Sequence, residues 1–231
     1  MTGCWLVKNS GRAGAKSITH RQGEKKMLVP PPVMNTSPFA HGRSMQPFYQ
    51  GKLDVFCALY AVLNGIKLTH GIGTLQARDV LHRTLLSLAS DLPTFQAVLE
   101  QRTDYIGVVD GMLRSLARTY PLQVVKPFTE EPAPSPAQLW RVCADFMHGG
   151  SNRALLFRFF RYITPDIPPI NRHWTAVEHM RGNAMHLFDC SHESGAILDF
   201  APDSFVTSPE DVALPRLCCI DPASIRFLSA R

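Results

Sequence analysis

The stretch YQGKLDVFCALYAVLNGIKL, residues 49–68, places one cysteine where an acidic, turn-prone segment meets a strongly apolar run. Asp54 is a good N-cap and predicts that Cys57 is the third residue of a buried helix. A thiol on the first turn of a helix lies at the positive end of the helix dipole, which favours the nucleophilic thiolate. Cysteine is also among the most buried residue types, so the segment alone is compatible with a nucleophile and with a core residue.

A cysteine nucleophile needs a base, and His173 is the best placed of the nine histidines. It begins the strand-like segment HWTAVEHM directly after the loop-like segment TPDIPPIN. A side chain at the start of a strand, beside a loop, can reach a cleft. The other histidines fall in the N-terminal segment, on helix surfaces, in turns or further along the same hairpin.

Asp189 lies in the next strand-like segment, AMHLFDC, and its position relative to His173 depends on the turn between the two strands. If residues 181–183 form a three-residue loop, Asp189 is the diagonal neighbour of His173 on the same face, with Cβ atoms about 7 Å apart. If Gly182-Asn183 form a two-residue turn, the register changes by one and Asp189 moves to the opposite face. The sequence leaves both registers open.

Gln50 could supply a fourth function, because its side-chain amide and the backbone N–H of Cys57 could together stabilise a developing oxyanion. The ordered set Gln50, Cys57, His173 and Asp189 resembles that of the papain-like cysteine peptidases. LDVFCALYAVLN is similar to their nucleophile helix, and HWTAVE and LFDC are similar to their His and Asn/Asp strands. The nearest resemblance is to bacterial members akin to the bacteriocin-processing leader peptidases, which use Asp in third place.

The resemblance spans residues 49–191 in layout and implies a papain-like α+β fold with a Cys57–His173–Asp189 triad. It implies that Cys57 attacks a carbonyl to form a thioester, that Asp189 fixes the imidazole tautomer, and that a peptide or isopeptide bond of a peptide or protein substrate is hydrolysed. The same triad would serve an acyltransferase or transamidase, and a non-catalytic papain-like binding module is a third reading. Two departures are Ala58, where the family usually has Gly, and the position of Gln50, one residue further from the cysteine than is common.

The pattern of the rest of the chain predicts helices first and strands second. Residues 54–68, 74–92, 111–121 and 137–147 have helical periodicity, and 122–128 read as a short strand. Beyond Arg153 the period shifts towards two, in strand-like segments separated by Gly, Pro, Asn and Asp. This order predicts α+β: a helical part at about 54–148 packed against an antiparallel sheet at about 153–229. Residues 1–45, which are basic and rich in Gly, Ser, Lys and Pro, are expected to be a flexible leader to a domain at 46–231.

The bulk composition excludes several classes of protein. The 231 residues are 45% hydrophobic and carry a net charge of +5, much of it in the leader, which argues against a folded nucleic-acid surface. No run approaches the ~20 apolar residues of a membrane span, and no signal peptide is visible, so we expect a protein of the cytoplasm or one delivered without a recognisable signal. The six cysteines show no framework spacing, which favours reduced thiols in a reducing compartment.

No cofactor or metal is expected from the motifs. HGIGTLQ is too short for either nucleotide-binding fingerprint. Cys190, His192, Cys218 and Cys219 lack the paired spacing of zinc ligands.

Overall fold

The computed structural model describes residues 45–51, 54–103, 105–129, 132–162, 170–191 and 197–231. The chain divides into two units, Met1–Ala40 and His41–Arg231, and the first lies outside the described residues. The expected flexible leader, residues 1–45, falls almost wholly there and stays a prediction. His192 and most of the TPDIPPIN segment also lie outside the described residues.

Helices and one sheet make up the second unit, so the expected α+β class is confirmed. The helices are α1 (Cys57–His70), α2 (Thr74–Ala89), α3 (Leu92–Leu99), α4 (Ile106–Leu116) and α5 (Pro136–His148). The strands are β1 (Leu122–Val125), β2 (Arg153–Arg161), β3 (Ile170–Arg181), β4 (Ala184–Phe188), β5 (Asp199–Phe200), β6 (Phe205–Val206) and β7 (Cys218–Ala230). None of the helices in these ranges is long and apolar enough to cross a bilayer.

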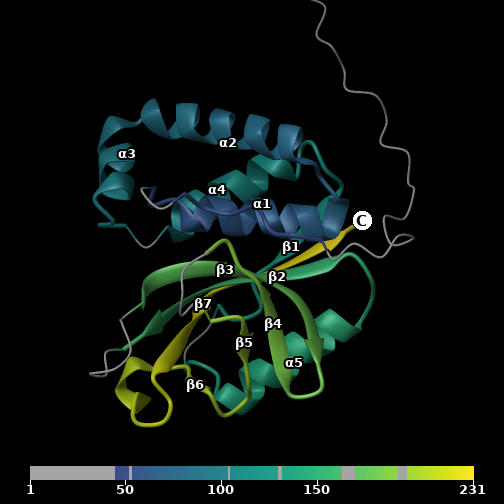
Figure 1. Ribbon diagram of the computed structural model, residues 1–231, viewed down its shortest axis with the longest axis vertical. Coiled ribbons are helices and arrows are strands. Elements are labelled where there is room, and N and C mark those ends of the chain that lie inside the picture. Colours follow the sequence, from purple (N-terminus) through teal and green to yellow (C-terminus); the bar gives the residue numbers. More distant parts are fainter. Residues whose placement is uncertain (1–44, 52–53, 104, 130–131, 163–169, 192–196) are drawn as a thin grey trace, which may run out of the picture. The chain divides into compact units, whose positions relative to one another are not determined.

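The sheet runs in the order β1-β7-β2-β3-β4-β5 with antiparallel neighbours, and β6 pairs with β7 in parallel. Helices α1 to α4 lie on one face, and α5 lies on the other (Figure 1). This differs from the expected division into a helical part and a sheet part, since α5 covers the second face and β1 is an edge strand of the sheet. The reason is visible in β2, where residues 154–159 are all buried: a strand buried on both faces needs cover on both sides.

Helix α1 is buried nearly all round, as its apolar pattern predicts, and packs on β2, β3 and β7. Gly65 makes this close approach possible. A Cβ built on Gly65 would lie 2.7 Å from Leu228 Cδ1 and 2.9 Å from Leu156 Cδ2. Trp174 is fully buried in the same core.

The start of α1 differs from the prediction. The helix begins at Cys57 with Phe56 at the N-cap position, so Cys57 is the first helical residue and not the third. Asp54 caps the preceding turn instead, because its carboxylate accepts hydrogen bonds from the backbone N–H groups of Phe56, at 3.1 Å, and Gly51, at 2.9 Å.

The helix predicted at 74–92 is shorter in the structure, and a second helix that was not predicted follows it directly. Helix α2 ends at Ala89, and Asp91 caps α3 by accepting a hydrogen bond from the backbone N–H of Thr94 at 3.3 Å. Pro93 lies in the first turn of α3, where its missing N–H costs nothing. Leu92, the last residue of the predicted helix, instead begins α3 and is 68% exposed.

Candidate active site

His173 and Asp189 are in direct contact. Nε2 of His173 lies 2.8 Å from Oδ2 of Asp189, whose side chain is only 3% exposed. The other carboxylate oxygen, Oδ1, accepts a hydrogen bond of 2.7 Å from the backbone N–H of Ser191. Both oxygens of Asp189 are thus engaged, which fixes the carboxylate and, through it, the imidazole ring.

A β-bulge decides this contact. The turn between β3 and β4 is the two-residue Gly182-Asn183 turn, with Arg181 opposite Ala184, the register expected to send Asp189 to the wrong face. The pairing shifts between His179–His186 and Val177–Leu187, so that Glu178 is an extra residue in β3. The extra residue restores the three-residue-loop register, in which Asp189 is the diagonal neighbour of His173.

A second irregularity lies directly before His173. Between the pairs Phe159–His173 and Arg161–Ile170 the register shifts again, and Arg172 has a positive φ of 51°. Backbone in this region is costly for a residue with a side chain, and such residues and bulges cluster at functional sites, where they re-aim a neighbouring side chain. The ring of Phe159 then packs edge-on against the imidazole of His173, with centroids 5.5 Å apart.

Cys57 contacts the same imidazole from the start of α1. Burial lowers the pKa of His173, but hydrogen bonds to Asp189 and Cys57, together with the negative charges of both, raise it from its ordinary value of 6.5 to about 10. Because Nε2 faces Asp189, the second nitrogen, Nδ1, is the one available to the thiol. One imidazole therefore lies between a thiol and a carboxylate, each of which can carry a negative charge.

Gln50 lies close to the segment that carries Asp189. Its backbone N–H donates to the carbonyl oxygen of Cys190, the residue after Asp189, at 2.8 Å. Its side-chain nitrogen donates to the carbonyl oxygen of Asp54 at 2.6 Å, which leaves the second hydrogen of that amide for another acceptor. As the first residue of α1, Cys57 also has a backbone N–H without an intrahelical acceptor, the donor that an oxyanion site requires.

Sequence reasoning missed Asn64, which ties these segments together. It is fully buried in α1, accepts a hydrogen bond from the backbone N–H of Phe48 at 2.7 Å, and donates to the carbonyl oxygens of Phe48 at 3.2 Å and Phe188 at 3.4 Å. Phe48 leads into Gln50, and Phe188 precedes Asp189. A polar side chain in a helix that is apolar all round was the signal that could have identified it.

Cys190 was also missed, except as a doubtful zinc ligand. The ligand atoms of His173, Asp189 and Cys190 lie within 4.8 Å of one another, a spacing that a metal ion could bridge. Burial, together with the charges of Asp189 and Cys57, raises the pKa of the Cys190 thiol well above its ordinary value. Both oxygens of Asp189 already take part in hydrogen bonds. The three side chains are therefore better suited to orienting the imidazole of His173 than to binding a metal ion.

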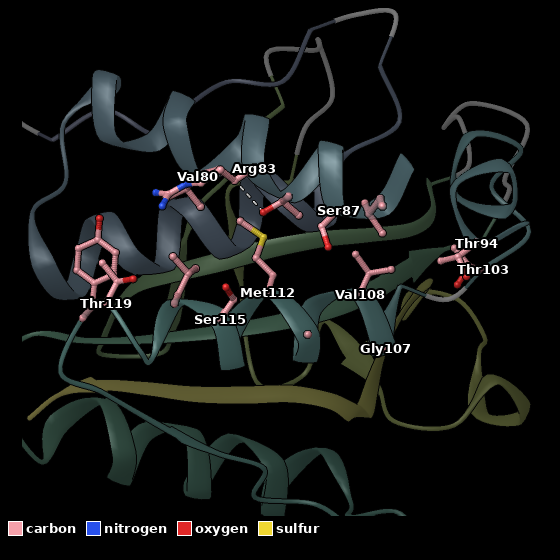
Figure 2. Close-up of a pocket in the computed structure, with 15 residues that line it drawn as sticks. Val80, Arg83, Ser87, Thr94, Thr103, Gly107, Val108, Met112, Ser115 and Thr119 are labelled. Atoms are coloured by element: carbon pink, nitrogen blue, oxygen red, sulfur yellow. Dashed lines mark hydrogen bonds between the residues drawn. The ribbon is translucent and has the colours of Figure 1, made fainter. Parts of the chain in front are cut away.

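A separate pocket of about 400 Å³ lies between α2 and α4 (Figure 2). Apolar side chains such as Val80 and Met112 and hydroxyl side chains such as Ser87 and Ser115 line it. None of the four residues predicted to act in catalysis is among the lining residues, and the lining contains no pair of a nucleophile and a base.

Comparisons with protein-family models and with curated protein sequences found no match to this chain. The assignment of a function therefore depends on the site itself. The structure brings together Cys57, His173 and Asp189 and places Gln50 next to Cys190, from segments more than a hundred residues apart in sequence.

Proposed function

We propose that the chain is a thiol-dependent hydrolase of the papain-like kind, which cleaves a peptide or isopeptide bond through Cys57, His173 and Asp189. The observation that carries the proposal is one imidazole held between a thiol at a helix start and a buried carboxylate. The nitrogen assignment supports it as well, because Nε2 facing the carboxylate leaves Nδ1 for the nucleophile.

The residues have distinct parts in the proposed reaction. His173 takes the proton of the Cys57 thiol, and the thiolate attacks the carbonyl carbon of the scissile bond to form a tetrahedral oxyanion. The backbone N–H of Cys57 and the side-chain amide of Gln50 donate hydrogen bonds to that oxyanion. As the C–N bond breaks, the imidazolium gives its proton to the leaving amine, and a thioester remains on Cys57.

Water completes the cycle. His173 takes a proton from the water molecule that attacks the thioester, and collapse of the second tetrahedral intermediate releases the carboxylic acid and returns the thiolate–imidazolium pair. Asp189 stays ionised throughout and holds the ring by accepting its Nε2–H. If an amine replaces water at this stage, the same residues perform acyl transfer.

A peptide-based electrophilic probe, such as a vinyl sulfone, tests the proposal without knowledge of the substrate. We expect one covalent adduct, located on Cys57 by mass spectrometry and formed far more slowly in His173→Ala. Fluorogenic peptide libraries, with and without an added amine such as hydroxylamine, then separate hydrolysis from acyl transfer. A Cys57 thiol that reacts no faster than a small free thiol would contradict the proposal and favour a non-catalytic binding module.

A further inference from the structure

Two histidines face each other across the β3–β4 hairpin, away from the residues of the proposed active site. His179 pairs directly with His186, and their ring centroids are 4.3 Å apart with planes inclined by 31°. His186 in turn pairs with Asp199 on β5, so the three side chains form a row across three neighbouring strands. Nothing in the proposed hydrolytic mechanism uses them.

A carboxylate lies behind each ring. The Oδ1 atom of Asp199 contacts Nδ1 of His186, and the Oε2 atom of Glu178 lies 3.8 Å from Nδ1 of His179. Glu178 can accompany its neighbour His179 because it is the extra residue of the β3 bulge. Nδ1 of His186 is bound to a carboxylate, whereas the carboxylate near Nδ1 of His179 lies beyond hydrogen-bond distance; Nε2 of each ring is the nitrogen left for a ligand.

The arrangement of His186 and Asp199 is one that histidines ligating a metal often have. Such histidines generally direct the second ring nitrogen at a carboxylate, which fixes the tautomer and makes the ligating nitrogen more basic. Two imidazole nitrogens on one tetrahedral zinc ion, each at about 2.0–2.1 Å, are roughly 3.3 Å apart, and the centroids of these two rings lie 4.3 Å apart. The side chains of His179 and His186 are 49% and 33% exposed, so water can complete the coordination sphere.

We propose that His179 and His186 bind one divalent transition-metal ion of the kind that prefers imidazole, such as Zn²⁺ or Cu²⁺, through their Nε2 atoms. Asp199 orients the ring of His186, and Asp199 and Glu178 both supply negative charge near the cation. The bound ion clamps β3 to β4 beyond the bulge, on the strands that also carry His173 and lead to Asp189.

Calorimetric titration of the full chain, without an affinity tag, with Zn²⁺ tests this site. We expect one site in wild type that is kept in Cys57→Ala, and at least tenfold weaker binding in His179→Ala and in His186→Ala. Asp199→Ala should weaken binding by roughly tenfold, as removal of an outer-shell carboxylate does. His82→Ala, which removes an exposed histidine of α2, is the matched control and should bind as wild type does.

Two further measurements separate loss of a metal ligand from loss of folding. His179→Phe retains a ring beside His186 without a ligand nitrogen, and it should fold with an unchanged melting temperature in EDTA and still lose the metal. The electron paramagnetic resonance spectrum of the Cu²⁺ form should show two equivalent nitrogen ligands. Binding that survives both histidine substitutions, or that disappears in Cys57→Ala, would overturn the proposal, and the latter result would place the metal at the active site.

Discussion

The carboxylate of Asp189 lies 2.8 Å from the imidazole of His173 across a hairpin whose turn alone would place the two residues on opposite faces. The extra residue in β3, Glu178, corrects the register, and the positive φ of Arg172 accompanies a second bulge directly before the histidine. Because a one-residue slip moves every side chain of a strand to the other face, the bulge at Glu178 decides whether the histidine has a carboxylate partner at all.

Cys57 should be the first thiol of the folded protein to react with iodoacetamide at mildly acidic pH. Burial raises the pKa of the thiols of Cys143 to about 12 and of Cys219 to about 11, and it raises those of Cys190 and Cys218 as well. Cys57, in contrast, is hydrogen-bonded to the imidazole of His173.

Mass spectrometry of a Cys4→Ser variant measures this order of labelling, since Cys4 lies outside the described residues. Labelling in urea, where all thiols should react alike, is the control. Faster labelling of Cys218 or Cys219 in the folded protein, with Cys57 protected, would favour Cys57 as a plain core residue.

Titration of His173 should give a pKa near 10 in wild type. Removal of either anionic partner, by Cys57→Ala or by Asp189→Asn, should lower it, since each supplies both a hydrogen bond and a charge. The NMR chemical shifts of the His173 ring as a function of pH provide the measurement. A wild-type value below 7 would show that the three residues do not form a charged unit.

The raised pKa of His173 also has a consequence for stability. Because the folded protein holds this proton more tightly than the unfolded chain, the contribution is fully present below the ordinary value of 6.5. It is lost progressively as the pH rises through about 10. The free energy of unfolding of wild type should therefore fall more steeply between pH 7 and 10 than that of Asp189→Ala, as measured by urea denaturation; parallel curves would contradict this.

Most of the elements that carry the site could be predicted from the sequence. The all-round apolar pattern after Leu53 predicts the buried helix α1. The alternation of apolar and polar residues predicts the strand that holds His173 and the strand that leads to Asp189. The register between them could not be predicted, because bulges arise from the packing of three or more strands and leave no local pattern. The prediction that Asp54 caps α1 was wrong for a similar reason. The Asp54 carboxylate accepts hydrogen bonds from the backbone N–H groups of Gly51 and Phe56, before the helix begins.

Gly65→Ala should destabilise the protein by about 1 kcal/mol. The added methyl meets Leu228 and Leu156 at less than van der Waals distance, and overpacking of this kind costs about 1–3 kcal/mol, which exceeds the gain of about 0.8–1.0 kcal/mol in helix propensity. Gly111→Ala, in α4, is the matched control, because its Cβ would have ordinary contact only, 3.9 Å from Arg114. It should be neutral or stabilising by up to about 1 kcal/mol in urea denaturation; equal effects of the two substitutions would show that α1 does not need a glycine there.

Asn64→Ala should lower both stability and the reactivity of Cys57 towards the probe. It leaves buried backbone groups of Phe48 and Phe188 without their partner, at about 1–3 kcal/mol for each group left unsatisfied. Thr69→Ala is the control, since its hydroxyl bonds only to α1 carbonyls and to the adjacent His70. Thr69→Ala should lose some stability and keep the reactivity of Cys57; equal losses of reactivity would show that Asn64 has no specific effect on the site.

The substitution series at Asp189 separates a triad from a chance cluster of side chains. Asp189→Asn should retain much of the rate of probe addition at Cys57, because the amide oxygen can still accept the Nε2–H of His173. Asp189→Ala should lose a further factor of roughly 10–100, the value of a hydrogen bond to a charged group. Cys57→Ala should abolish peptide hydrolysis. The double variant with Asp189→Ala should be no worse, because the effects of substitutions in one catalytic unit are not additive.

Asp203→Ala, which removes an exposed carboxylate, is the control. If Asp189→Ala and Asp203→Ala both react as fast as wild type, Asp189 does not orient His173, and the third member of the site must be sought elsewhere.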